Sequence, residues 1–170
     1  QLAEAEADAH GLTVLPFLAG ERAPGWAGHA RAAFTGIGWH TRPIDLLQAG
    51  LEAVAYRFAL IYRLLNQAVE GAEEVIVSGG AMLSSPAWTQ ILSDVLGRPV
   101  IASAESEATS RGAALLALEA LDVVQDASDL EPALGDTFRP RPDRHERYQQ
   151  AIERQQDLYD KLIGRRPAGG

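Results

Sequence analysis

The chain has 170 residues, 46% of them hydrophobic and 22% charged, which is typical of one globular domain with a sizeable core. Its formal net charge of -8 disfavours nucleic-acid binding, because phosphate backbones attract clustered Lys and Arg, and the arginines here are dispersed among acids. No apolar run of about 18 residues free of polar groups occurs, which argues against a membrane partner or span.

The sequence contains no cysteine, so it has neither a disulfide framework nor a thiolate metal site, which fits a cytoplasmic protein. No spacing brings two of the histidines to one metal from a single element, and no protein-bound metal is expected. The histidines are His10, His29, His40 and His145. Because the chain begins at Gln1 and its only methionine is Met82, we expect it to be the later part of a longer protein without a secretory signal.

The first forty residues predict little regular structure. Residues 2–10 alternate alanine with acids and indicate a short helical segment, and residues 12–18 indicate a strand that Pro16 keeps from a central position. Pro24-Gly25 marks a turn within a loop over residues 20–26, and an irregular connection is expected to run on to about Phe34.

A long helix is predicted from Pro43 to Val69, beginning at the proline and ending at Gly71. Its apolar residues recur every three or four positions, so we expect them to form the inner face of a helix buried on much of its circumference. These residues are Ile44, Leu47, Leu51, Val54, Phe58, Ile61, Leu65 and Ala68.

The next segment predicts a strand, a glycine turn and a helix. Val75-Ile76-Val77 lacks alternation, as expected of a strand covered on both faces. Ser85 is predicted to cap a helix that starts at Pro86 and ends at Gly97. Its inner face is expected to comprise Trp88, Ile91, Leu92, Val95 and Leu96.

The remaining sequence predicts one strand and two helices. Residues 99–102 indicate a strand, and Ser106 can cap a helix through about Leu121, with Gly112 placed for close approach of another backbone. Residues 122–144 are polar, carry three prolines and predict an irregular crossing segment anchored by Phe138. A final helix is expected to bury one stripe, formed by Tyr148, Ile152, Tyr159 and Leu162.

Alternating strands and helices predict an α/β domain with a mainly parallel sheet, in which ligands bind at the carboxyl ends of the strands. Residues 78–84 lie at such an end. Adjacent glycines there let a ligand lie on the backbone, because no Cβ stands in the way, and the following helix directs N–H groups to the same place. Gly79-Gly80 as a tight turn alone is the structural alternative, and Ser84 is either a ligand contact or a helix cap.

Several motifs together resemble the carboxy-terminal domain of the FGGY carbohydrate kinases. Residues 32–37 followed by 45–52 are similar to the second signature of that family, and Gly20 to Trp26 resembles its gluconate-kinase branch more than the xylulose kinases. Ser78-Gly79-Gly80 is similar to the family's adenosine motif. Residues 107–114 resemble the helix that packs beside that motif, and the ending from Phe138 onward is also similar.

The resemblance implies an actin-like, ribonuclease-H-like ATPase fold that lacks its first strands, with a partial domain over residues 1–164 and a disordered tail over residues 165–170. It implies adenosine contacts by Gly80 and Ser84 within a cofactor-binding segment, and binding of ATP or ADP with Mg²⁺ bridging the phosphates. The residues of this segment are Ser78, Gly79, Gly80, Ala81 and Ser84.

The implied reaction transfers a phosphoryl group from ATP to a hydroxyl of a gluconate-type or pentulose-type substrate. The family's Asp-x-Gly-Thr phosphate loop, its catalytic aspartate and most sugar contacts are not found in these 170 residues. No catalytic residue is therefore assigned, and the chain alone is expected to be inactive and to bind ATP weakly or not at all. A noncatalytic interaction or regulatory module of the same fold is the alternative function, and a homodimer is a possible assembly.

Other polar and aromatic residues have structural and functional interpretations. Glu21 and Arg22 either face an interdomain cleft or form a surface ion pair that steadies their loop. Asp45 and Glu52 suggest paired carboxylates, although a structural role is favoured because Asp45 lies in the first helical turn. A position over a ligand is open for Trp26, whereas burial is expected for the other tryptophans, Trp39 and Trp88.

Overall fold

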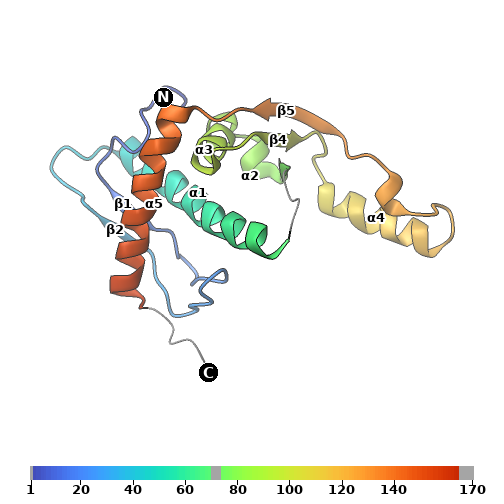
Figure 1. The fold of residues 1–170 in the computed structure, drawn as a ribbon, viewed down its shortest axis with the longest axis horizontal. Helices are drawn as coiled ribbons and strands as arrows, with labels where there is room; N and C mark the ends of the chain where they lie inside the picture. Colours follow the sequence, from blue (N-terminus) through green and yellow to red (C-terminus); the bar gives the residue numbers. More distant parts are fainter. Residues whose placement is uncertain (1, 70–73, 165–170) are drawn as a thin grey trace.

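The computed structural model describes residues 2–69 and 74–164 of the chain (Figure 1). The predicted helix stop at Gly71 and the predicted tail over residues 165–170 lie outside the described residues. Strands β1 (Thr13–Leu15) and β2 (Ala33–Thr35) pair antiparallel, with Val14 opposite Phe34. The expected irregular connection up to Phe34 therefore ends in a short strand instead.

A three-stranded sheet contains β3 (Val75–Val77), β4 (Val100–Ser103) and β5 (Leu134–Phe138), with β4 in the centre. β3 runs parallel to β4, and β5 runs antiparallel to it. The predicted α/β class is confirmed, but the sheet is mixed instead of mainly parallel. β5 was missed because Gly135 and Asp136 are poor strand formers and the strand is largely exposed, so the pattern lacks an apolar face.

Three long helices pack against one another beside this sheet. α3 contacts both α1 and α5, which also contact each other, and both α1 and α5 contact β1 (Figure 1). The helices are α1 (Pro43–Ala68), α2 (Gly80–Leu83), α3 (Pro86–Leu96), α4 (Ala108–Ala120), the 3-10 helix η1 (Ala127–Asp129) and α5 (Pro142–Leu162). No described helix is both long and apolar enough to cross a membrane.

The buried face of α1 differs from the predicted one. Three residues of the predicted inner face are substantially exposed in the described chain: Leu47 (51%), Phe58 (47%) and Leu65 (54%). The face that packs inward carries alanines and polar side chains instead. It comprises Gln48, Ala49, Glu52, Ala53, Ala55, Tyr56, Arg57 and Ala59. Alanines let α1 approach its neighbours closely, and the buried polar groups bond across that interface.

The stripes of α3 and α5 follow the sequence pattern more closely. Ile91, Leu92 and Val95 of α3 are buried as predicted, and Gly97 ends that helix in the left-handed conformation. On α5 the residues Tyr148, Ile152 and Tyr159 are buried, but Leu162 is 59% exposed. β3 is not covered on both faces by the described residues, because Ile76 is 44% exposed.

Several predicted boundaries differ in the structure. Residues 2–10 form turns and not a helix. α4 has Glu107 at its N-cap with no side-chain cap bond, so the predicted Ser106 cap is wrong. The segment predicted as irregular contains η1 and β5, and α5 begins earlier, at Pro142, because proline suits a first helical turn.

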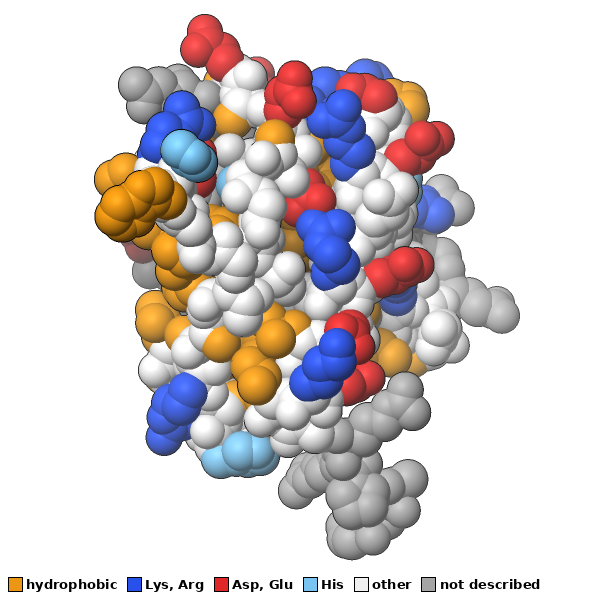
Figure 2. Space-filling view, turned by 90° about the vertical axis from the view of Figure 1, so that its left-hand side faces the viewer, with side chains coloured by type: hydrophobic (Ala, Val, Ile, Leu, Met, Phe, Trp, Pro, Cys, Tyr) orange, Lys and Arg blue, Asp and Glu red, His pale blue; other side chains and the backbone are white. Residues whose placement is uncertain are grey.

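α4 projects from the body at the end farthest from α5, beyond β4 and β5 (Figure 1). A Cβ at Gly112 would meet nothing within 4 Å, so the predicted close backbone approach does not occur among the described residues. On the face in Figure 2, acidic and basic side chains are interspersed with apolar ones, in keeping with the dispersed arginines of the sequence.

Candidate functional site

The predicted cofactor-binding segment lies directly after β3. Gly79 has a φ of +91° and precedes α2, which Gly80 begins. A Cβ built on Gly79 or Gly80 would meet nothing within 4 Å, so the space above both residues is open. The five predicted residues are all exposed and lie on this short segment: Ser78, Gly79, Gly80, Ala81 and Ser84. The structure thus brings them together, and a ligand could lie directly against their backbone.

The two serines after α2 have different roles. Ser85 is the N-cap of α3, and its Oγ accepts a hydrogen bond from the backbone N–H of Trp88 at 3.4 Å. Ser84 ends α2, and its exposed hydroxyl donates only a long, 3.4 Å bond to the carbonyl of Ala81. Ser85, and not Ser84, is therefore the cap of α3, and the hydroxyl of Ser84 is accessible to a ligand.

A hydrogen bond from α3 fixes the position of the predicted cofactor-binding segment. The hydroxyl of Thr89, which is 1% exposed, donates to the carbonyl of Met82 at 3.1 Å. The indole N–H of Trp88 donates to the carbonyl of Leu51 at 3.1 Å and so ties α3 to α1. We call the five residues Ser78, Gly79, Gly80, Ala81 and Ser84 the platform. The platform offers backbone groups and hydroxyls but no charged side chain. Chemically it suits an uncharged ligand moiety such as a nucleoside better than a polyphosphate.

The helix expected beside this platform packs elsewhere. Among the described elements, α4 packs mainly on η1. Arg111 near its start forms an ion pair with Glu105 at 3.3 Å. The similarity of residues 107–114 to the family motif is therefore not matched by close packing of α4 against the platform.

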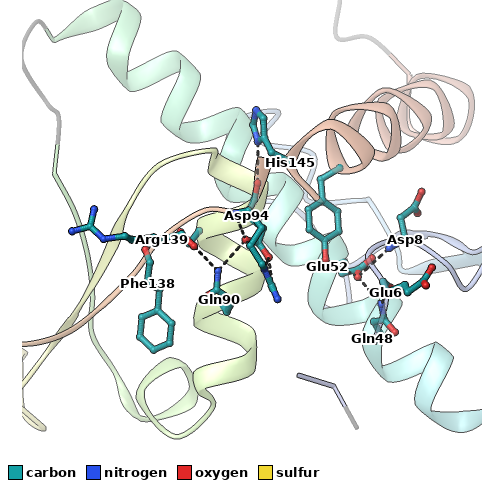
Figure 3. A network of polar contacts seen from close by, with 12 residues as sticks. Glu6, Asp8, Gln48, Glu52, Gln90, Asp94, Phe138, Arg139 and His145 are labelled. Atoms are coloured by element: carbon teal, nitrogen blue, oxygen red, sulfur yellow. Dashed lines mark hydrogen bonds and ion pairs between the residues drawn. The ribbon is translucent and has the colours of Figure 1, made fainter. Parts of the chain in front are cut away.

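A second polar cluster, which we call the Glu52 cluster, lies between α1, α5 and the first turns (Figure 3). The Glu52 side chain is fully buried. Burial alone would raise its pKa, but hydrogen bonds to the carboxylate outweigh burial and lower the pKa below the ordinary value. Its hydrogen-bond partners are the backbone N–H of Asp8 and the side chains of His10, Gln48, Tyr56 and Tyr148.

The sequence predicted a structural role for Glu52 without its partners. Gln48 and Tyr56 lie four residues before and after Glu52, so one helical face places both donors beside the carboxylate. That spacing was a usable signal. Asp45, in contrast, binds Arg42 at the start of α1, which lowers the pKa of Asp45 to about 2. The two carboxylates therefore do not form a pair.

The Glu52 cluster resembles a metal site only in composition. Ligand atoms of Asp8, His10 and Glu52 lie within 4.8 Å of one another. However, Nδ1 of His10 accepts a hydrogen bond from the backbone N–H of Leu12 at 3.0 Å, so the ring proton is on Nε2. Nε2 donates that proton to Glu52 at 3.0 Å and has no lone pair for a metal. The arrangement is that of a hydrogen-bonded structural cluster.

Asp94 joins α3 to the start of α5 (Figure 3). Its side chain is fully buried and accepts hydrogen bonds from Nη2 of Arg141 at 2.5 Å and from Nε2 of Gln90 at 2.9 Å. The hydrogen bond and charge of Asp94 raise the pKa of Arg141. The adjacent Ser93 donates to the carbonyl of Phe138, which connects the same helix to the end of β5.

Glu21 forms a buried ion pair, but not with its neighbour Arg22. Its Oε1 accepts from Nη2 of Arg57 on α1, and its Oε2 accepts from the hydroxyl of Tyr159 on α5 at 2.5 Å. Both predicted environments of Glu21, a cleft and a surface pair, are therefore wrong. No sequence signal identified Arg57, which lies 36 positions away and outside the apolar stripe predicted for α1.

The burial of the three tryptophans agrees with the prediction only in part. Trp88 packs against the core as expected. Trp39 was expected to be buried but is 99% exposed. Trp26 is 68% exposed and has a φ of +53°, so its ring is accessible to a ligand.

The model of the FGGY family of carbohydrate kinases, C-terminal domain, matches residues 1–121. The gluconokinase of Bacillus subtilis is 30% identical over 132 residues, which cover 78% of this chain but 26% of that protein. The chain thus spans about a quarter of the length of this curated relative.

Solved kinase structures show the same fold. The xylulose kinase from Rhodospirillum rubrum is 31% identical with a TM-score of 0.79, covering 95% of this chain and 32% of that one. The Plasmodium falciparum glycerol kinase solved with ADP is 24% identical with a TM-score of 0.72, covering 91% of this chain and 31% of that one. These likenesses confirm the predicted actin-like kinase fold. The chain belongs to the FGGY family of carbohydrate kinases and corresponds to its C-terminal domain.

Proposed function

We propose that this chain is the ATP-binding part of a kinase that transfers the γ-phosphoryl group of ATP to a hydroxyl of a sugar or sugar acid. The observation that carries the proposal is the open glycine platform after β3, in a chain of this family. The segment would hold the adenosine moiety, with Gly80 and Ser84 in direct contact. The solved relative with ADP is in keeping with a nucleotide site in this fold.

The platform can orient ATP but supplies little of the chemistry. Phosphoryl transfer depends on positioning the reactants and neutralising phosphate charge, and none of the five platform residues carries a charge. Mg²⁺ would bridge the phosphates, and a carboxylate would accept the proton of the attacking hydroxyl. Both the metal ligands and this base would come from polypeptide beyond the present 170 residues.

The acceptor is proposed to be of the gluconate or pentulose type. The relatives include a gluconokinase and a xylulose kinase by name. A screen of the complete protein with gluconate, xylulose, ribulose and glycerol would distinguish these acceptors. No phosphorylation of any of them would contradict the proposal.

Gly80→Val tests the nucleotide site in the complete protein that contains this chain. Because a Cβ at Gly80 meets nothing within 4 Å, the substitution should leave the fold intact. A branched side chain would nevertheless occupy the space proposed for adenosine, so the Kd for ATP, measured by calorimetry, should rise at least tenfold. Gly112→Val is the matched control, because its Cβ also meets nothing, but on α4. Equal ATP affinity in both variants would refute the placement.

The isolated chain provides a second test. We expect no sugar-dependent ADP release from the purified 170-residue chain, even with Mg²⁺ and saturating ATP, because it carries no proposed catalytic base. Reproducible turnover that is lost in Gly80→Val would mean that the chemistry lies within this chain.

A further inference from the structure

The turn that carries the platform is too short to hold its own shape. α2 has four residues, none of them buried. The N–H of Leu83 donates to the carbonyl of Gly79 at 3.1 Å. The N–H of Ser84 donates to the carbonyl of Gly80 at 2.9 Å. A single helical turn is unfavourable by itself, because it orders several backbone torsions for few hydrogen bonds, and the two glycines add conformational freedom. The turn therefore depends on contacts with the rest of the chain.

Thr89 on α3 supplies a directional contact to this turn. The residue is 1% exposed, and its hydroxyl lies 3.1 Å from the carbonyl of Met82 and 3.4 Å from the carbonyl of Ser85. A helical threonine can bond to the carbonyl four residues earlier, which is Ser85 here. The hydroxyl has one proton, however, and the shorter distance assigns that proton to Met82. Thr89 thus donates out of its own helix and into the platform turn.

Met82 connects this contact to the ligand-facing residues. It lies between Gly80 and Ser84 in the chain, and its carbonyl also accepts from the N–H of Ser85 at 3.1 Å. Its partly buried side chain packs on the core and lines a mostly apolar cavity of about 350 Å³. An adaptable thioether chain beside open space does not fix the orientation of the turn, whereas hydrogen bonds to the carbonyl do, because they depend on direction. The orientation of the turn therefore depends on the bond from Thr89.

We infer that Thr89 is a positioning residue for ATP, which acts through the carbonyl of Met82. The bond keeps the Gly80 backbone and the Ser84 hydroxyl in the arrangement that binds adenosine. This inference rests on the proposed function and adds a residue that is too buried for the nucleotide to touch. Without the bond, the turn spends only part of its time in the binding arrangement, and the apparent Kd for ATP rises by the inverse of that fraction.

Hydrogen exchange in the complete protein that contains this chain tests the positioning without ATP. Thr89→Val keeps nearly the same shape and removes the hydroxyl. The amides of Leu83 and Ser84 should then exchange at least about fivefold faster, read by mass spectrometry on peptides that cover residues 80–85. Peptides from the later part of α3, residues 91–96, should exchange as in the parent. Unchanged exchange over residues 80–85, or an equal increase over residues 91–96, would overturn the inference.

ATP affinity tests the consequence for binding. Thr89→Val should raise the Kd for ATP at least about threefold, measured by calorimetry at a temperature where circular dichroism shows every variant folded. A merely structural threonine would lower the melting temperature and leave this Kd unchanged. Thr89→Ser retains the hydroxyl and should stay within about twofold of the parent.

Thr35→Val is the matched control. The hydroxyl of Thr35 also donates to a backbone carbonyl at 3.1 Å, that of Thr13, but in the other sheet. This variant should therefore bind ATP like the parent. An unchanged Kd in Thr89→Val, an equal rise in Thr35→Val, or an equal rise in Thr89→Ser would each refute the role of the Thr89 hydroxyl.

The two proposals fail in different ways. If Gly80→Val weakens ATP binding and Thr89→Val does not, the platform stands and the role of Thr89 is wrong. If Gly80→Val leaves ATP affinity unchanged, the nucleotide placement is wrong, and the inference fails with it. The exchange measurement separates these cases, because it reports the contact from Thr89 whether or not the turn binds ATP.

Discussion

The hydroxyl of Tyr148 donates a 3.0 Å hydrogen bond to Oε1 of Glu52, which lies 96 positions earlier in the chain. Both residues are at most 1% exposed, so the bond joins α1 to α5 inside the core. Tyr56 donates to the second carboxylate oxygen, also at 3.0 Å. A buried charge is tolerated here because donors from three parts of the chain surround it, and the relative placement of two helices depends on that charge.

Glu52→Gln should therefore destabilise the chain strongly. The amide cannot accept at both positions, so at least one buried donor loses its partner, and we expect a loss of about 3 kcal/mol in the free energy of unfolding. Urea unfolding followed by circular dichroism at pH 7 measures it. Glu153→Gln on the exposed side of α5 is the control and should change stability by less than about 0.5 kcal/mol. Similar losses in both variants would argue against the cluster.

The same carboxylate should contribute to acid sensitivity. Hydrogen bonds lower the pKa of Glu52 in the folded chain, so the unfolded chain binds more protons as the pH falls. The stabilisation is fully present above the unfolded pKa of about 4.3 and is lost as the pH falls through the lower folded value. Between pH 7 and pH 3 the parent should lose more stability than Glu52→Gln. Parallel pH profiles of the two proteins would contradict this assignment.

The sequence predicted local features well. The signals for a helix start depend on only a few neighbouring residues, and α1 and α3 begin where these signals place them. The signals are Pro43 for α1, and Ser85 with Pro86 for α3. The glycine platform was likewise a local backbone signal. The exposed side of α1 was not predictable, because periodicity identifies an apolar stripe without identifying the surface that covers it. The pairing of Glu21 with Arg57 joins distant segments through side chains that have no spacing rule.

The two platform glycines should differ in their tolerance of a side chain. Gly79 has a φ of +91°, which L residues adopt at a cost, so Gly79→Ala should lower stability by about 1–2 kcal/mol. Gly80 lies in α2 with open space above it, so Gly80→Ala should be neutral or slightly stabilising. Thermal unfolding of both variants checks the difference. Equal melting temperatures would mean that Gly79 is not held in this conformation.

Gly97 and His145 should show coupled effects on stability. Gly97 ends α3 with a φ of +66°, and a Cβ there would lie 2.5 Å from Cε1 of His145. The ring is held by a 2.9 Å hydrogen bond between Nδ1 and the carbonyl of Asp94, so it cannot move away without losing that bond. Gly97→Ala should therefore cost more than the roughly 1–2 kcal/mol expected from backbone conformation alone.

A double-mutant cycle separates the two contributions. Adding His145→Ala removes the clash but not the backbone cost, so the double variant should lose at least about 0.5 kcal/mol less than the sum of the single variants. Gly50→Ala is the control, because Gly50 lies in the middle of α1 with nothing within 4 Å of its Cβ, and it should stabilise the chain by up to about 1 kcal/mol. Strict additivity at Gly97 and His145 would show that the ring does not limit this position, and the cost of Gly97→Ala would then come from its backbone alone.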